Sequence, residues 1–310
     1  MSQIIVSHND ADGIICVALT FIKFPESKFY VYFATPSSLK QRLCKIIMQR
    51  DVNSDIFLYD LTPTNESLYL AGIFSDILWI DHHEWDKLNK PSNPNIKLIN
   101  DPKAESNAKL VAKHFKIKSE LVEIANQIDK NNVKTEDAEF LRDAINAVKH
   151  FYMKTPLLLN SRLKKISVQL ALSGIDKLRK DLELFSLIEK NKKREEKLKT
   201  ELLKNVKTFE INNKKVAIYE TMNPIPSYVV LNKLKEHPDS PFDIIIVLFR
   251  QLNPKTRKIS TKIELRTHTD TDVVRLAKLL GGGGHRVASG ASFNGILKNE
   301  DLIQKIREIY

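Results

Sequence analysis

Cysteine and glycine are scarce in this chain. Its 310 residues include two cysteines and nine glycines. Cys16 and Cys44 form no metal-binding or redox spacing, so neither marks a thiol-based site. Because Cys16 lies in an apolar stretch, we expect it to be a buried, reduced thiol.

Long hydrophobic runs are also missing. No apolar stretch approaches the roughly 20 residues that cross a bilayer, so no membrane association is expected. The N-terminus leads directly into an apolar strand, without the basic and apolar regions of a secretory signal. These features favour a cytoplasmic location and leave the oligomeric state open, a homodimer included.

Acidic residues are the minority charge. Lys and Arg number 49 against 38 Asp and Glu, which gives a net charge of +11 and favours an anionic partner such as nucleic acid or a nucleotide. Residues 160–207 hold 14 basic and 7 acidic residues, so this segment carries +7 of the +11. Two interpretations stay open for it: a solvated connector helix, or a basic strip along a nucleic-acid path.

Strands and helices alternate through the first 130 residues, which predicts an α/β fold with a doubly wound parallel sheet. Short apolar runs indicate buried parallel strands. The expected strands are 4–6, 29–33, 56–59, 77–80 and 96–99, and the expected helices are 14–24, 39–49, 106–115 and 120–130.

The length favours two domains. We predict a first domain over 1–135, a helical connector over 136–207 without strand signals, and a smaller α/β domain over 208–310. In the last part we expect a hairpin around Asn212-Asn213, strands at 243–250 and 258–266 around Asn253-Pro254, and helices at 228–235 and 270–280.

Polar side chains follow three of the predicted strands. His8-x-Asp10-x-Asp12 comes after the first, Asp60 after the third, and Asp81-His82-His83 after the fourth. The carboxyl ends of parallel strands meet in one crevice, where ligands of open α/β sheets bind. Four carboxylates and three imidazoles would gather there, and such a concentration of like charge requires cations between them.

This mixture of ligands indicates the metal. Carboxylates with imidazoles suit Mn²⁺ best, with Mg²⁺, Co²⁺ or Zn²⁺ as alternatives. Two ions about 4 Å apart, bridged by a carboxylate and a water, form a phosphoryl-transfer site in which the water reacts as hydroxide.

The same residues resemble the motifs of the DHH phosphoesterase superfamily, and residues 282–290, Gly-Gly-Gly-His-Arg-Val-Ala-Ser-Gly, resemble the DHHA1 signature. Together the motifs span nearly the whole chain in the family's order. The resemblance implies that His8 and Asp10 hold a first ion, Asp12 and His82 a second, and that Asp60 bridges them. It also implies that His83 contacts the scissile phosphate and that Asp81 fixes the orientation of the histidine rings.

The family's last acidic ligand should lie on a helix after the sheet. Asp129 is the best candidate, although the usual neighbouring residues are absent and Lys130 follows; Asp101 is a weaker competitor. Ser106 resembles a serine near the family's active site and also fits an ordinary helix N-cap. Of the remaining histidines, His114, His150 and His237 are expected to be structural. His268 lies nearer in the sequence to the glycine-rich motif, residues 281–286, that is expected to bind phosphate.

In the second domain, glycines followed by His285 and Arg286 let backbone amides and two cationic side chains approach a phosphate. Arg266 resembles the family's arginine on the preceding strand. The implied substrate-binding residues are Arg266, Gly282, Gly283, Gly284, His285 and Arg286, while Gly281 fits a helix C-cap.

The resemblance implies a metal-dependent phosphodiesterase, with an exonuclease that degrades short RNA or single-stranded DNA to nucleoside monophosphates as the leading interpretation. RecJ-type and oligoribonuclease-type features are both present, so strand polarity and the choice of RNA or DNA stay open. The alternatives are a cyclic-dinucleotide phosphodiesterase, a phosphatase acting on 3′-phosphoadenosine 5′-phosphate, and, in another class, an inactive replication scaffold.

Overall fold

The computed structural model describes residues 3–85, 87–89, 94–252 and 257–310. The chain divides into two compact units, Met1–Lys190 and Asn191–Tyr310. None of the helices in the described part of the chain combines the length and the apolar character that crossing a bilayer requires.

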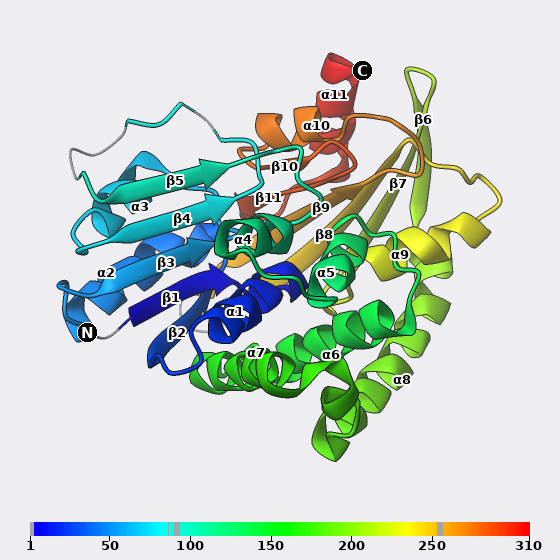
Figure 1. Cartoon of the computed structure of the whole chain (residues 1–310). Coiled ribbons are helices and arrows are strands. Elements are labelled where there is room, and N and C mark those ends of the chain that lie inside the picture. The colour runs from blue at the N-terminus through cyan, green and yellow to red at the C-terminus, as the bar shows by residue number, and fades with distance from the viewer. Residues whose placement is uncertain (1–2, 86, 90–93, 253–256) are drawn as a thin grey trace. The chain divides into compact units, whose positions relative to one another are not determined.

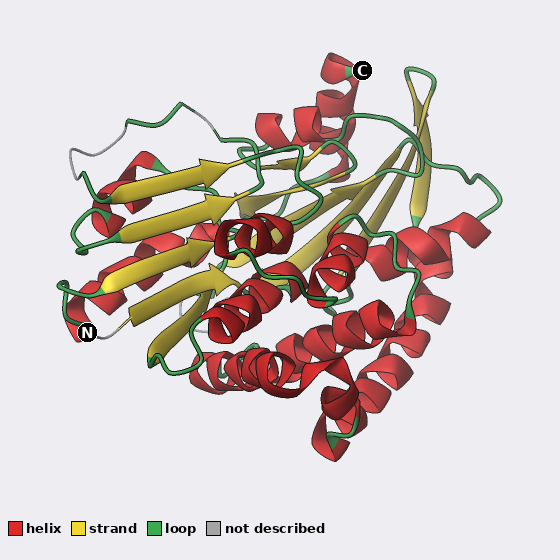
Figure 2. Cartoon of the chain, viewed as in Figure 1, coloured by secondary structure: helices red, strands yellow, loops and turns green. Residues whose placement is uncertain are grey.

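The first unit is an α/β fold in which five strands form one sheet (Figures 1 and 2). Its elements are β1 (Gln3–His8), α1 (Ala11–Lys23), β2 (Phe29–Ala34), η1 (Pro36–Ser38), α2 (Leu39–Gln49), β3 (Asp55–Tyr59), α3 (Asn65–Ala71), β4 (Ile77–Asp81), β5 (Ile96–Asn100), α4 (Asn107–Phe115), α5 (Leu121–Asp129), α6 (Glu136–Tyr152) and α7 (Pro156–Arg179). The helix α8 (Leu182–Asn205) runs across the division.

The sheet is parallel throughout, with strand order β2-β1-β3-β4-β5. Alternate residues of each strand enter different cores. Ile5, Tyr59 and Ile80 pack with α1, α4 and α5, whereas Val6 and Trp79 pack with α2 and α3. Helices therefore cover both faces (Figure 1), and the doubly wound fold predicted from the alternation is confirmed.

The helices predicted as a connector take part in these units. α6 and α7 pack in the core of the first unit, where Leu141, Ile145 and Leu163 are buried. The last turns of α8, with Leu198 and Leu202, pack in the core of the second unit. The observed division thus falls inside the predicted connector, and the predicted limits 135/136 and 207/208 stay a prediction.

The second unit holds a six-stranded mixed sheet, with order β10-β11-β9-β8-β7-β6 and β7 parallel to β8. Its elements after α8 are β6 (Lys207–Ile211), β7 (Lys214–Thr221), α9 (Ser227–Lys233), η2 (Leu234–Glu236), β8 (Ile244–Leu252), β9 (Ile259–Arg266), α10 (Val274–Leu279), β10 (Gly283–His285), β11 (Ala288–Asn294) and α11 (Asn299–Ile309). The hairpin predicted at Asn212-Asn213 is confirmed: both residues have positive φ, 49° and 60°, which asparagine tolerates better than most residues.

Three features differ from the sequence-based expectation. No strand was expected in the glycine run, whereas Gly283 and Gly284 pair with β11 in a short hairpin. The helix expected from residue 270 begins at Val274, because Thr269 and Thr271 donate their hydroxyls to Asp243 in a turn that competes with helix formation. The helices α3 and α11 were not anticipated, and the turn expected at Asn253-Pro254 lies outside the described residues.

Candidate metal centre

The strand order reverses between β1 and β3, which are neighbours in the middle of the first sheet. At such a switch point the connections leave toward opposite faces, so a crevice opens at the carboxyl ends of the strands. β1 ends at His8, and Asp60 follows β3 directly. The predicted strand-end residues therefore surround this position.

The turn from β1 to α1 places His8 against Asp10. Asp10 is the N-cap of α1 and accepts a hydrogen bond from the backbone N–H of Gly13 at 3.0 Å, while its Oδ2 lies 2.6 Å from Nδ1 of His8. Gly13 is required by close packing, because a Cβ there would lie 2.2 Å from the carbonyl oxygen of His8. The glycine thus lets the helix begin immediately beside the strand tip.

Asp60 is the central residue of the cluster. Its side chain is 2% exposed, and neither carboxylate oxygen accepts a hydrogen bond from any residue that the structure describes. One oxygen lies 3.4 Å from Nδ1 of His8 and the other 3.5 Å from Nε2 of His82. The backbone of Asp60 adopts a left-handed conformation, with φ of 57°, and a non-glycine residue held in this region often marks a functional site.

His82 faces three carboxylates from three elements. Its Nε2 lies 3.5 Å from Asp60, 3.6 Å from Asp129 at the end of α5, and 3.8 Å from Asp12. Asp12 is itself fixed by the start of α4, where the backbone N–H groups of Asn107 and Ala108 donate to its two oxygens at 2.6 and 2.8 Å. The partial positive charge of a helix N-terminus stabilises a carboxylate there.

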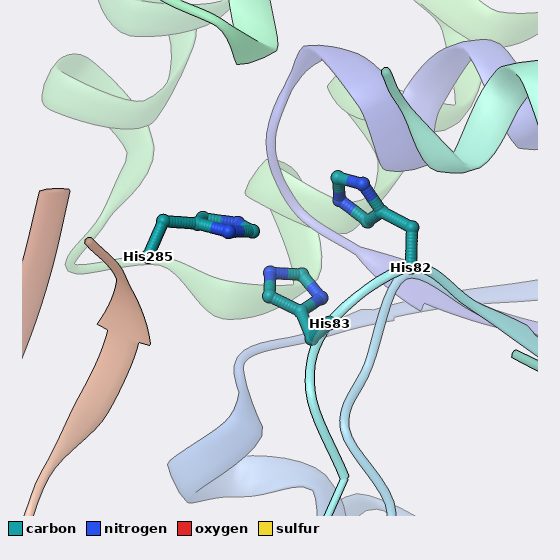
Figure 3. Close-up of side chains that lie close together, drawn as sticks. All are labelled: His82, His83 and His285. Atoms are coloured by element: carbon teal, nitrogen blue, oxygen red, sulfur yellow. The ribbon is translucent and has the colours of Figure 1, made fainter. Parts of the chain in front are cut away.

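His83 points toward the carboxylate of Asp81, with 2.7 Å between its Nδ1 and Oδ1 of Asp81. Figure 3 shows the rings of His82 and His83 next to each other at the end of β4, with ring centroids 4.7 Å apart. Asp81 is fully buried. This contact restrains the His83 ring, and the roles that the resemblance implies for Asp81 and His83 stay predictions.

Crowding of carboxylates shifts the pKa values of the cluster. Burial lowers the pKa of His8, but the carboxylates of Asp10 and Asp60 outweigh it and raise the pKa to about 10. The pKa of His82 is likewise raised to about 10, against burial, by Asp60, Asp12 and Asp129. Burial and the neighbouring carboxylates raise the pKa of Asp129 to about 7 and that of Asp12 well above its usual range.

The residues fit divalent cations. Two groups of ligand atoms, each within 4.8 Å of one another, share Asp60: His8 with Asp10, and Asp12 with His82. Asp60, Asp81 and His83 form a third such group. A buried carboxylate without hydrogen bonds, shared between two sets of ligands, is a suitable bridge for two ions.

Three other residues considered as site candidates make ordinary structural contacts. Asp101 accepts the backbone N–H of Lys103 in an exposed turn. Ser106 is the N-cap of α4 and donates its hydroxyl to Asn126. His268 is bound by the backbone on both ring nitrogens: Phe242 N–H donates to Nδ1, and Nε2 lies 2.7 Å from the carbonyl of Leu231.

In the second unit, the strand register aligns two of the predicted substrate-binding residues. His285 on β10 is opposite Ala288 on β11, and Ala288 is opposite Arg266 on β9. Paired residues of antiparallel strands face the same side of a sheet, so His285 and Arg266 lie on one face with Ala288 between them. Their backbones are about 10 Å apart, which is two strand spacings. Arg286 donates to the backbone carbonyl of Asp270 and is exposed.

Close packing accounts for two of the glycines before His285, Gly282 and Gly284. A Cβ on Gly282 would lie 2.0 Å from the carbonyl oxygen of Gly290. Gly283, by contrast, has open space around it. Close packing therefore explains Gly282 without a ligand, and the phosphate-binding role predicted for Gly282, Gly283 and Gly284 stays a prediction.

Comparison with protein families gives one match, the DHHA1 domain, over residues 213–310. The C-terminal part of the chain therefore matches the model of the DHHA1 domain. Comparison with curated proteins gives no match. Among solved structures, the chain is similar over 99% of its length to the whole pGpG-specific phosphodiesterase PggH from Vibrio cholerae, with 16% identity and a TM-score of 0.60.

Two structures of the exonuclease RecJ are also similar. A manganese-bound RecJ matches 99% of this chain and 89% of its own, with 14% identity and a TM-score of 0.54. RecJ from Thermus thermophilus with Mn²⁺ matches 94% of this chain and 49% of its own, with 13% identity and a TM-score of 0.54. The chain thus shares its fold with these proteins over nearly its whole length, and the match to the DHHA1 family model over residues 213–310 confirms the resemblance indicated by the C-terminal motif.

Sequence reasoning missed residues that hold the DHH motif in place. Asn100, at the end of β5, donates its side-chain amide to the backbone carbonyls of Asp81 and His83, both at 2.9 Å. Trp85 donates its indole N–H to Asp81 at 2.6 Å. Asn100 and Trp85 are not at a spacing typical of a catalytic motif, and neither is a residue type tied to catalysis. Only the fold therefore reveals their contacts.

Proposed function

We propose that this chain is a divalent-metal-dependent phosphodiesterase that degrades short RNA or single-stranded DNA from an end to nucleoside monophosphates. One observation carries the proposal: both oxygens of Asp60 are buried at the switch point of the sheet, between two sets of ligand atoms, and neither accepts a hydrogen bond from a residue that the structure describes. The fold shared with a phosphodiesterase and an exonuclease supports the same reaction class.

Six residues would hold two cations: His8, Asp10, Asp12, Asp60, His82 and Asp129. When bound, such ions supply a nucleophile from water near neutral pH and neutralise charge on the reacting phosphate. Mn²⁺ fits the mixture of carboxylates and imidazoles and is the ion present in RecJ structures of this fold.

His83 would contact the scissile phosphate. Its Nδ1 is directed at Asp81, so the opposite side of the ring, with Nε2, is presented to a substrate oxygen. The buried carboxylate of Asp81 holds this orientation and raises the pKa of His83, against the effect of burial, which favours a protonated ring that donates to an anion.

The DHHA1 domain would bind the rest of the substrate. Arg266 and His285 face the same side of its sheet, and Arg286 is exposed at the adjoining turn. Cationic and imidazole side chains in this arrangement suit phosphates of a short single strand.

A linear dinucleotide is the second candidate, favoured by the match along the full length of a pGpG-specific phosphodiesterase. Such a substrate is the shortest member of the oligonucleotide series and requires no extra nucleic-acid-binding domain.

One experiment tests these proposals together. The purified protein is incubated with Mn²⁺ and labelled RNA and DNA of two to thirty nucleotides, with linear and cyclic dinucleotides and 3′-phosphoadenosine 5′-phosphate alongside. We expect mononucleotide release that is lost with a chelator. Release confined to dinucleotides would favour the second candidate, and Mn²⁺ binding without any hydrolysis would contradict the phosphodiesterase assignment. Absence of specific Mn²⁺ uptake would favour a scaffold.

A further inference from the structure

The indole of Trp85 is hydrogen-bonded to the carboxylate that orients His83. Trp85 Nε1 donates to Oδ2 of Asp81 at 2.6 Å, while Oδ1 of the same carboxylate lies 2.7 Å from Nδ1 of His83. The two oxygens are thus used by two different partners. Hydrogen bonds to a charged acceptor are shorter and stronger than neutral ones, and both distances are in that short range.

The position of Asp81 explains this chain of contacts. Ile80 enters the core on the α1 and α4 side, so the next residue of β4 faces the side of α2 and α3. Trp85 packs against the core on that same side, which fixes its ring. An aspartate carboxylate can rotate about its Cβ–Cγ bond unless both oxygens are hydrogen-bonded. The Trp85 ring, fixed by packing, is a rigid donor to one of them.

We propose that Trp85 is a positioning residue that acts through Asp81 to hold His83 in its reactive orientation. The proposal rests on the phosphodiesterase function proposed above. Trp85 touches neither the metal ligands nor the phosphate in this scheme, so its loss should change turnover and leave cation binding intact. Residues that orient catalytic groups in this way typically contribute about 10- to 100-fold to activity.

The first test separates positioning from packing. In Trp85→Phe the ring keeps its contact with the core and loses the N–H donor. We expect kcat to fall about tenfold, with KM and bound Mn²⁺ close to those of the unaltered chain, and the melting temperature to fall by a few degrees because the buried Asp81 loses one donor. Tyr30→Phe is the matched control, because it removes an aromatic donor near the opposite end of the sheet, where Tyr30 pairs with Ile4.

A double-mutant cycle tests the route of the effect. If Trp85 acts through Asp81, then Trp85→Phe should not slow the Asp81→Asn variant any further. Equal fold-losses in both backgrounds would mean that Trp85 acts elsewhere and would overturn the inference. An unchanged kcat in Trp85→Phe would overturn it as well.

A spectroscopic readout tests the contact independently of activity. The chain has two tryptophans, so ¹⁵N-labelled protein should give two indole N–H resonances, and Trp85→Phe assigns one of them. We expect Asp81→Asn to move the Trp85 resonance upfield and leave that of Trp79, which donates to the carbonyl of Leu61, in place. An insensitive resonance would refute the contact. Absence of hydrolysis by the unaltered chain would overturn the proposed function and this role with it, whereas hydrolysis at an unchanged rate in Trp85→Phe overturns the inference alone.

Discussion

At the scale of single residues, Asp60 combines three unfavourable features. It is a buried carboxylate, its oxygens accept no hydrogen bond from the described residues, and its backbone is left-handed. Burial of a carboxylate and a left-handed backbone each cost stability, and in the absence of a metal the protonated rings of His8 and His82 offset part of that cost. Residues of this kind are retained for function.

Replacing Asp60 by Asn tests its role between the two sets of ligands. Asparagine keeps the size and tolerates positive φ, but it carries no charge to bridge two cations. We expect hydrolysis to fall more than about 100-fold, beyond the loss typical of residues that only orient ligands, and the chelator-treated protein to melt at a lower temperature, because the protonated rings of His8 and His82 lose a carboxylate that they share. Calorimetry with and without Mn²⁺ and an activity assay measure this. Near-normal turnover would remove Asp60 from the centre.

The two candidates for the last metal ligand can be distinguished by a matched pair of substitutions. Asp129 lies 3.6 Å from His82, whereas Asp101 accepts a backbone N–H in an exposed turn. Asp129→Asn should lower Mn²⁺ affinity and turnover about tenfold or more. Asp101→Asn keeps the accepting oxygen and should leave both unchanged. The opposite pattern would transfer the ligand role to Asp101.

At the scale of elements, the strand ends could be predicted from the sequence because parallel strands bring their carboxyl ends to one edge. His8, Asp60 and His82 each follow an apolar run, so their convergence needed only the strand assignments. The anchoring of Asp12 by the start of α4, and that of Asp81 by Asn100 and Trp85, could not be predicted. Those contacts depend on the order of strands and on how α4 packs over the sheet.

The turn between β1 and α1 has no room for a side chain at Gly13. In Gly13→Ala, the new Cβ would push against the backbone of His8, so the strand tip must move. We expect a loss of about 1–3 kcal/mol in the free energy of unfolding, as for other overpacked sites, together with weaker Mn²⁺ binding. Gly283→Ala, which meets open space, is the control for stability in urea unfolding. Equal stability of the two variants would contradict the close approach.

The cluster of strand ends should bind cations more tightly as the pH rises. Without a cation, the pKa values of His8 and His82 are raised to about 10, so both rings are protonated at pH 7 and must lose a proton to bind a metal. The raised pKa of Asp129, about 7, acts in the same direction. Calorimetric titration with Mn²⁺ between pH 6 and 9, in buffers of different ionisation enthalpy, should show proton release and a falling Kd. Affinity that is independent of pH would contradict this.

At the scale of the whole molecule, two units are proposed to divide the work, with metal binding in the first and substrate binding in the DHHA1 domain. The sequence predicted the parallel sheet, the hairpin at Asn212-Asn213 and most helices. It did not predict the hairpin of β10 and β11, because glycines give no strand signal and their pairing is set by the neighbouring β9. The sequence also did not predict the packing of α6 and α7 in the first unit, because charged helices are equally typical of a solvated connector.

This division predicts that substrate binding can be weakened without loss of metal. Arg286→Gln should raise KM for oligonucleotides about tenfold, the effect expected for one lost hydrogen bond to a charged group, with kcat and bound Mn²⁺ little changed. Arg307→Gln removes the same charge from an exposed position of α11 and serves as the control. Loss of Mn²⁺ in Arg286→Gln would argue against separate tasks.

The hairpin that carries His285 also determines how the second sheet ends. β10 is the outermost strand on one side, yet it is three residues long, and two of these are glycines. Such a short, glycine-rich edge strand offers few backbone groups with which another chain could pair. The exposed histidine is thus presented on an edge that discourages aggregation, and lengthening this strand with β-branched residues should make the protein prone to form intermolecular sheets.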